Sequence, residues 1–231
     1  MKLIEQLSPT FLKWPLQRTM LLAFLAFLIL QGSGCMSLAT FQDAKVLEEK
    51  QVELGAHMGY FDYDGSGGIF SPERAVDMAA YLRAGIGSNM EVTARVSTMF
   101  SLNGGLKYQF YENDNGVLAM ASGIQTGFLL AQVETNEPAG WLRIPYIISL
   151  HPSPYFTWYG SANYSFIGHT SSASERYFHF TSGIKFGNKM GLMIESNFIP
   201  NWNRAIPVIS NAPFSIIYGH QQFHVGAYFR I

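Results

Sequence analysis

A short stretch in the second half of the chain, 169–175, gathers side chains that could hydrolyse an ester. His169, Ser171 and Glu175 are the residue types of a general base, a nucleophile and an orienting group. Such groups act together only when they lie within hydrogen-bond reach of one another. No Gly-x-Ser-x-Gly motif is present, and a Ser-rich loop is most often simply solvated. We therefore expect a protein that is not an enzyme, and keep a hydrolase as the alternative.

A second stretch has the spacing of a calcium-binding loop. Asp62, Asp64, Ser66 and Glu73 fall at positions one, three, five and twelve, and Gly67 takes the turn position. An EF-hand also needs a helix on each side, whereas a strand-like segment precedes this loop. The alternative is a Gly-rich surface loop without metal. The six histidines show no short-range metal spacing, and we expect no cofactor.

The N-terminal residues are typical of an export signal. Lys2, Lys13 and Arg18 precede an uninterrupted apolar run, 20–30, which small residues follow. The run is too short to cross a membrane as a helix, because a spanning helix needs about 20 residues. A basic flank, a short apolar run and small residues together indicate a secretory signal peptide. The alternative is a short buried or membrane-anchoring helix.

The single cysteine directly follows the small residues 32–34. This small-small-Cys arrangement resembles the processing box of bacterial lipoproteins. The resemblance implies cleavage before a diacylated Cys35, a signal peptide of 1–34 and palmitate on the cysteine. The alternative is an ordinary signal peptidase site after the Ser-Leu-Ala tripeptide that follows, which has the small-x-small pattern. The signal peptide would then be 1–39, and the mature chain would begin at Thr40.

The rest of the chain alternates between apolar and polar residues. A period of two is typical of strands with two different faces. In 223–231, for example, every second residue is apolar. We expect ten such segments: 52–62, 79–87, 90–99, 102–111, 117–131, 141–150, 154–167, 176–187, 189–199 and 214–231.

The composition and the segment lengths favour a membrane barrel over a soluble sandwich. Charged residues make up 13% of the chain and the net charge is −1, which excludes a disordered chain, a charged coiled coil and a nucleic-acid partner. Many segments exceed the about 5–6 residues of soluble strands and reach the about 9–11 that a tilted spanning strand needs. We therefore predict an all-β, antiparallel transmembrane β-barrel of about ten strands, with eight or twelve as alternatives.

The connectors alternate in length, as they do in outer-membrane barrels. The long connectors are 63–78, 132–140, 168–175 and 200–213, and short ones lie between them. The very short connection at 100–101 is an exception, because an outer loop is expected there. An even number of strands places both ends on the periplasmic side. We thus expect a periplasmic segment over 35–51 and a barrel over 52–231, in the outer membrane of a Gram-negative-type bacterium.

The end of the chain resembles the C-terminal recognition signal of outer-membrane barrels. His224, Gly226, Phe229 and Ile231 match its polar, glycine, hydrophobic and terminal hydrophobic positions. Residues 40–58 also resemble the beginning of the first strand in many uncharacterised outer-membrane barrels. These resemblances imply the barrel-assembly machinery as a partner, and the cysteine box implies the lipoprotein-processing machinery.

Polar residues on the inward faces determine what the lumen could do. They are predicted to be Glu53, His57, Arg83, Glu91, Arg95, Lys107, Arg143, Lys185, Glu195, His224 and Arg230. Opposite charges in a narrow lumen should pair, because an isolated ion there is costly. The side chains could then form a salt-bridged plug or leave a polar path. We therefore expect either a structural role or the restricted passage or binding of a small solute. The sequence does not indicate which solute.

The hydrolase alternative has a resemblance of its own. The His-Thr-Ser order at 169–171 resembles the His-x-Ser pairing of lipid A deacylases. The resemblance implies a deacylase-like hydrolase that acts on outer-membrane lipid with residues of an outer loop.

Overall fold

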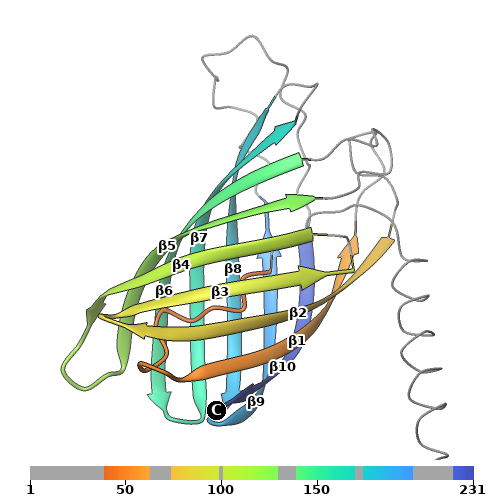
Figure 1. Cartoon of the computed structure of the whole chain (residues 1–231). Coiled ribbons are helices and arrows are strands. Elements are labelled where there is room, and N and C mark those ends of the chain that lie inside the picture. Colours follow the sequence, from red (N-terminus) through yellow and green to blue (C-terminus); the bar gives the residue numbers. More distant parts are fainter. Residues whose placement is uncertain (1–38, 63–73, 99–100, 130–138, 170–173, 200–220) are drawn as a thin grey trace, which may run out of the picture.

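The computed structural model describes residues 39–62, 74–98, 101–129, 139–169, 174–199 and 221–231. Ten antiparallel strands close into one barrel (Figure 1). They are β1 (Val52–Asp62), β2 (Arg74–Gly87), β3 (Met90–Ser97), β4 (Ser101–Glu112), β5 (Leu118–Leu129), β6 (Ala139–Ser153), β7 (Phe156–His169), β8 (Glu175–Gly187), β9 (Met190–Phe198) and β10 (Gln221–Arg230). The predicted all-β antiparallel barrel is confirmed, with ten strands rather than eight or twelve.

Each strand pairs with its neighbours in sequence, and the pairing of β1 with β10 closes the barrel. In this register, Glu53 of β1 lies opposite Arg230 of β10 on one side and Arg83 of β2 on the other. Residues directly opposite each other on paired strands share a face and interact. The closing register therefore places a carboxylate between two arginines.

The alternation in the sequence corresponds to an inner and an outer face. In β6, the side chains of Trp141, Arg143 and Ile147 are buried, whereas those of Ile144 and Tyr146 are exposed. Buried side chains face the lumen, and exposed large apolar side chains face outward. Across the described ranges, no helix has the length and hydrophobicity to cross a membrane.

Two predicted boundaries differ from the observed strands by five residues or more, and the others agree within three residues. β2 begins at Arg74 rather than at 79, so part of the expected connector 63–78 is strand. The strand alternation continues through this part of β2, with Val76 exposed on the outer face and Asp77 fully buried on the inner face. β10 begins at Gln221, and the preceding residues of the predicted segment lie outside the described part of the chain.

The short connectors define one end of the barrel, which we call the turn end; the opposite strand ends define the loop end. At the turn end, Ser88 and Asn89 join β2 to β3 with φ angles of 51° and 57°, which is the two-residue turn that matches strand twist. The C-terminus lies at the same end (Figure 1). Val52 and Ile231 exchange backbone hydrogen bonds of 3.0 and 2.8 Å there.

Candidate functional site

The side chains that the sequence analysis assigned to the lumen lie on the inner face of the barrel. All of them are buried except those of Arg95 and Arg230, which are half-buried. Further buried polar residues join them, among them Asp77, Asn163 and His179. The lumen is therefore polar over much of its length.

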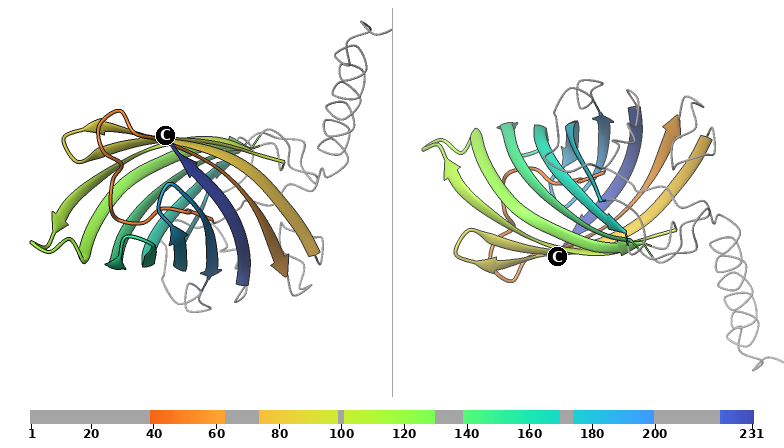
Figure 2. Two further views of the ribbon diagram at one scale, coloured as in Figure 1. Left: turned by 90° about the horizontal axis from the view of Figure 1, so that it is seen from below. Right: turned by 90° about the horizontal axis from the view of Figure 1, so that it is seen from above.

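A stretch of chain ahead of β1 lies inside the barrel. We call residues 39–47 the inserted segment; views along the barrel show it within the wall of strands (Figure 2). It enters from the turn end, where Glu49 forms a parallel bridge with Gly85. A Cβ on Gly85 would collide with the carbonyls of Leu47 and Glu48, so only glycine permits this approach.

The sequence analysis predicted a periplasmic segment over 35–51, and within the described part of that range residues 39–47 lie inside the barrel. The sequence did not indicate this position because the inserted segment lacks strand periodicity and is bound largely through its backbone. Barrel side chains act as its hydrogen-bond partners: the amide of Leu47 donates to Glu91 Oε2 at 3.1 Å, and the amide of Ala44 donates to Ser149 Oγ at 3.1 Å. Such partners allow an irregular backbone to be buried without unpaired polar groups.

Buried charges toward the turn end form one connected network. Arg83 lies at its centre, with Nε 2.7 Å from Glu91 Oε1 and Nη1 2.8 Å from Glu53 Oε1. Lys185 Nζ is 3.0 Å from Glu53 Oε2, and Arg230 Nη2 is 2.8 Å from the same oxygen. Each of these charges has an opposite charge beside it, as burial of ions requires.

The inserted segment contributes Asp43 to this charge network. Its carboxylate lies 3.3 Å from Lys185 Nζ and 4.0 Å from Arg83 Nη2. Lys107 Nζ donates hydrogen bonds of 2.9 Å to the carbonyls of Asp43 and Lys45. Burial alone would raise the pKa of Asp43, but the surrounding cations outweigh that effect and hold the pKa well below its ordinary value. Asp43 therefore anchors the segment as a carboxylate.

Glu195 of β9 binds the far part of the inserted segment. Its side chain is fully buried, and it accepts hydrogen bonds of 2.7 Å from the amides of Thr40 and Phe41. Thr40 Oγ1, Tyr159 Oη and Asn197 Nδ2 also donate to it, at 3.1, 2.9 and 3.2 Å. Several donors from the segment and the wall thus converge on one carboxylate.

Phe41 fills the lumen near Glu195. Its ring centroid lies 4.5 Å from that of His57 and 6.0 Å from that of His224, and it stacks on Tyr81 at 6.4 Å. A cavity of about 30 Å³ beside it, lined in part by Arg143, is about the volume that one water molecule occupies. The packing here leaves little free space around the segment.

A larger cavity lies at the turn end. Its volume is about 620 Å³, and its lining includes Lys45 and His151. His151 Nε2 lies 2.7 Å from Ser149 Oγ, and its Nδ1 lies 2.9 Å from Thr157 Oγ1. Because Ser149 is fully buried and accepts a bond from the inserted segment, the pair lacks the accessible nucleophile that hydrolysis needs.

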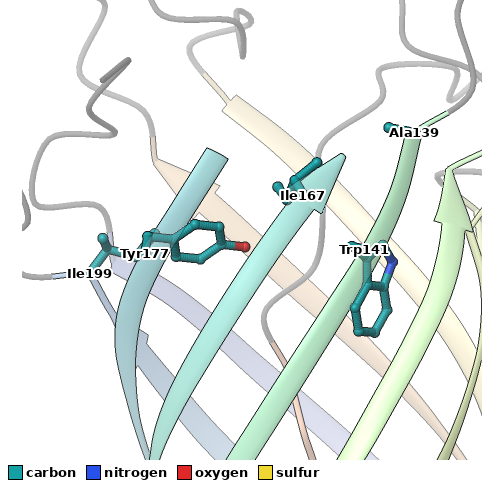
Figure 3. Close-up of a cluster of buried hydrophobic side chains, with 5 residues drawn as sticks. All are labelled: Ala139, Trp141, Ile167, Tyr177 and Ile199. Atoms are coloured by element: carbon teal, nitrogen blue, oxygen red, sulfur yellow. The ribbon is translucent and has the colours of Figure 1, made fainter. Parts of the chain in front are cut away.

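The inner face toward the loop end carries an apolar patch alongside buried polar residues such as Asp77 and Gln222. A buried cluster there consists of Ala139, Trp141, Ile167, Tyr177 and Ile199 (Figure 3). It comes from β6, β7 and β8 and from the residue that follows β9. The lumen thus holds the connected charge network toward the turn end and this apolar cluster toward the loop end, and the inserted segment runs from the first region toward the second.

The remaining predicted site residues lie outside this arrangement. His169 ends β7, Glu175 begins β8 and Asp62 ends β1, but their side chains are not described. The described ranges also exclude Cys35, Asp64, Ser66, Glu73 and Ser171. Among the described residues, no group of three His, Cys, Asp or Glu side chains could hold a metal ion. The lipidation, calcium and hydrolase assignments therefore stay predictions.

Two acidic residues of the lumen were not identified from the sequence. Asp77 pairs with Arg95 at 3.1 Å, and it shares the alternation of Tyr81 and Arg83, so extending that pattern toward the N-terminus would have identified it. Asp43 offered no such signal, because an acidic residue ahead of the first strand resembles an ordinary solvated one.

The outer face of the barrel is strongly apolar. Its exposed side chains include Met58, Ile124 and Leu192, and the aromatic residues Tyr108, Phe110, Trp158, Phe186, Phe198, Phe223 and Phe229. Water-soluble monomers rarely expose a contiguous apolar surface on this scale, whereas an outer-membrane barrel needs an outward apolar band with aromatic residues. The outer face therefore fits a lipid environment.

The site and the fold together define a closed ten-stranded barrel that holds part of its own chain. No protein-family model and no curated protein matches it. Among solved structures, the chain is similar to the NanC porin, with 10% sequence identity and a TM-score of 0.46. The match covers 76% of this chain and 98% of the porin. An outer membrane channel from Pseudomonas putida F1 shows 7% identity, coverage of 84% and 100% and a TM-score of 0.46. A bacterial polysaccharide outer membrane secretin shows 7% identity, coverage of 80% and 99% and a TM-score of 0.43. This similarity concerns the barrel architecture alone.

Proposed function

We propose that the protein is an outer-membrane barrel that admits a small solute when its inserted segment withdraws from the lumen. The observation that carries this proposal is the segment itself. It occupies the lumen, yet ion pairs and hydrogen bonds hold it there rather than strand pairing along its length. A lumen filled only by side chains of the strands would favour a purely structural role. The apolar outer face supports the membrane location.

The charge network indicates which solute the open lumen would favour. Four cations, Arg83, Lys107, Lys185 and Arg230, face three carboxylates, Asp43, Glu53 and Glu91. Withdrawal of the segment removes Asp43, so the same cations would then face two carboxylates. Rings or clusters of basic side chains in a pore favour anions. We therefore propose small anions as the solutes of the open state.

Conductance in planar lipid bilayers tests this function. The parent protein is expected to show little current, and deletion of 40–47 is expected to give channels that prefer anions over cations. Glu48→Gln serves as the control, because Glu48 is exposed and lies just outside the inserted segment. If the deletion variant folds but conducts no better than the parent, the lumen is closed by the strands themselves and the role is structural.

We also propose that export and assembly follow the signals in the sequence. The leader would direct export, with processing either before Cys35 or after Ala39, and the assembly machinery would bind β10 through His224, Gly226, Phe229 and Ile231. Ile231 is exposed, and its backbone pairs with Val52, so Ile231→Lys would change the signal without removing that pairing. Less heat-modifiable barrel in outer-membrane fractions of Ile231→Lys cells would support this role. Normal assembly would contradict it.

A further inference from the structure

Glu195 differs from the other buried carboxylates of the lumen. Asp43, Glu53, Asp77 and Glu91 each have a Lys or Arg nitrogen within 4.0 Å. Within the described part of the chain, no such nitrogen lies within that distance of Glu195, although its side chain is 0% exposed. A buried ion is costly without an opposite charge, even when hydrogen bonds surround it. Arg95 and Arg143 interact electrostatically with Glu195, but only from beyond that distance. A cation in direct contact would therefore complete the pairing of this carboxylate.

The backbone nitrogen of Thr40 occupies the place where that cation would be needed. It lies 2.7 Å from Glu195 Oε1, while Thr40 Oγ1 lies 3.1 Å from Oε2. In the sequence, the tripeptide Ser-Leu-Ala directly precedes Thr40 and follows the apolar run 20–30. Small residues in this spacing form the cleavage site of an ordinary signal peptide. The contact of the Thr40 nitrogen with Glu195 and the small-x-small pattern before Thr40 therefore indicate the same peptide bond, the one between Ala39 and Thr40.

We propose that the chain is cleaved between Ala39 and Thr40 and that the α-ammonium group of Thr40 is the counter-ion of Glu195. A signal peptidase would use water to hydrolyse this bond. The C–N bond breaks, the oxygen of water bonds to the carbonyl carbon of Ala39, and Ala39 leaves as the carboxylate end of the leader. The Thr40 nitrogen takes up protons and becomes an ammonium group. It gains a positive charge and two further donors at its present position.

Burial determines when the cleavage must occur. Ala39 is 2% exposed, and its carbonyl accepts a hydrogen bond of 2.7 Å from Arg95 Nη1. A peptidase could not reach this bond in the folded barrel, so cleavage precedes folding. Arg95 would keep its ion pair with Asp77 after the Ala39 carbonyl has left. Processing before Cys35 would instead leave Thr40 as a neutral amide and Glu195 without a cation in direct contact.

Mass spectrometry of the protein purified from membranes tests the cleavage site. Trypsin cuts after Lys45, so the expected N-terminal peptide is 40–45 with a free α-amine. An acylated chain that begins at Cys35, or any chain that keeps residues before Thr40, would overturn the proposal.

The reactivity of the α-amine tests the counter-ion role separately. An acetylating reagent is expected to label the Thr40 amine at least about tenfold more slowly in the folded protein than in denaturant. Glu195→Gln keeps the shape of the side chain but removes its charge, and should speed labelling of the folded protein. Tyr159→Phe, which removes one neutral donor from Glu195, should keep most of the protection.

Equal labelling rates in folded and denatured parent protein would overturn the counter-ion role even if the chain begins at Thr40. Unchanged labelling in folded Glu195→Gln would do the same. The comparison within the parent protein does not depend on whether the variant folds. Neither measurement depends on solute passage, so failure here and failure of the proposed function are distinguishable.

Discussion

Arg83 lies within ion-pair distance of three carboxylates of the lumen. It is 1% exposed, and its nitrogens lie 2.7 to 2.9 Å from carboxylate oxygens of Glu53 and Glu91. Removing one partner of a buried ion pair leaves uncompensated charge and typically costs about 3–5 kcal/mol. We expect Arg83→Met to lower the free energy of unfolding by that amount, measured by urea unfolding in lipid vesicles.

The matched control for this change is Arg176→Met. Arg176 is exposed and lies over the ring of Phe166, with 5.7 Å from its guanidinium carbon to the ring centroid. An exposed contact of this kind contributes at most about 1 kcal/mol. Similar losses of stability in the two variants would show that the buried charge network does not stabilise the barrel.

Asp43 gives the inserted segment a defined response to pH. Because its pKa lies well below its ordinary value of 3.8, its attraction to the surrounding cations is fully present above about pH 4 and is lost as the pH falls toward the lowered pKa. We expect constant low conductance between about pH 5 and 8, and an increase only below about pH 4. Bilayer recordings across this range check the expectation.

Removing the charge of Asp43 by substitution should raise the conductance as acidification does. Asp43→Asn is expected to conduct at neutral pH and to respond less to acidification, while Glu48→Gln should behave like the parent. A conductance change centred near neutral pH would assign the response to groups other than Asp43.

At the scale of elements, the contact between β2 and the inserted segment depends on Gly85. An added Cβ would collide with the carbonyl of Leu47 in the segment and with that of Glu48 directly after it, so Gly85→Ala should displace the segment while β2 remains paired. We expect faster tryptic cleavage after Lys45, detected by mass spectrometry, together with higher conductance. In Gly104→Ala the new Cβ would lie 3.5 Å from the carbonyl of Thr93, an ordinary contact. If both variants resist trypsin equally, the close approach at Gly85 does not control the segment.

The strands were predictable from the sequence because each has two faces in different surroundings. β1 was predicted with its observed limits, since apolar and polar residues alternate from Val52 onward. The inserted segment was not predictable, because side chains of distant strands bind its backbone, and backbone amides are the same in every sequence. Glu195 could be assigned to a strand face, but its partner Thr40 is 155 residues away. No local pattern indicates that pairing.

At the scale of the whole molecule, the barrel presents one apolar surface that only lipid would cover favourably. Ile124 lies near the middle of β5 and is 49% exposed on this surface. An arginine facing lipid near the midplane costs about 2–4 kcal/mol, and the cost falls toward the interfaces. We expect Ile124→Arg to make folding into vesicles less favourable by that amount, measured by urea titration.

Asn115→Arg is the control, because Asn115 is exposed in the short connector between β4 and β5. We expect only a small change in this variant. If Ile124→Arg has as little effect as the control, the surface does not face lipid and the barrel is a soluble domain.

The closure of the barrel by its first and last strands has a consequence for biogenesis. The inserted segment is joined to β1, and β1 forms the seam with β10, the last strand to be made. A barrel that sealed this seam first would have to insert the segment afterwards through the turn end, past the buried charges that bind it. Docking of the segment on the wall should therefore come before sealing. The inserted segment would then act as an internal template around which the sheet wraps.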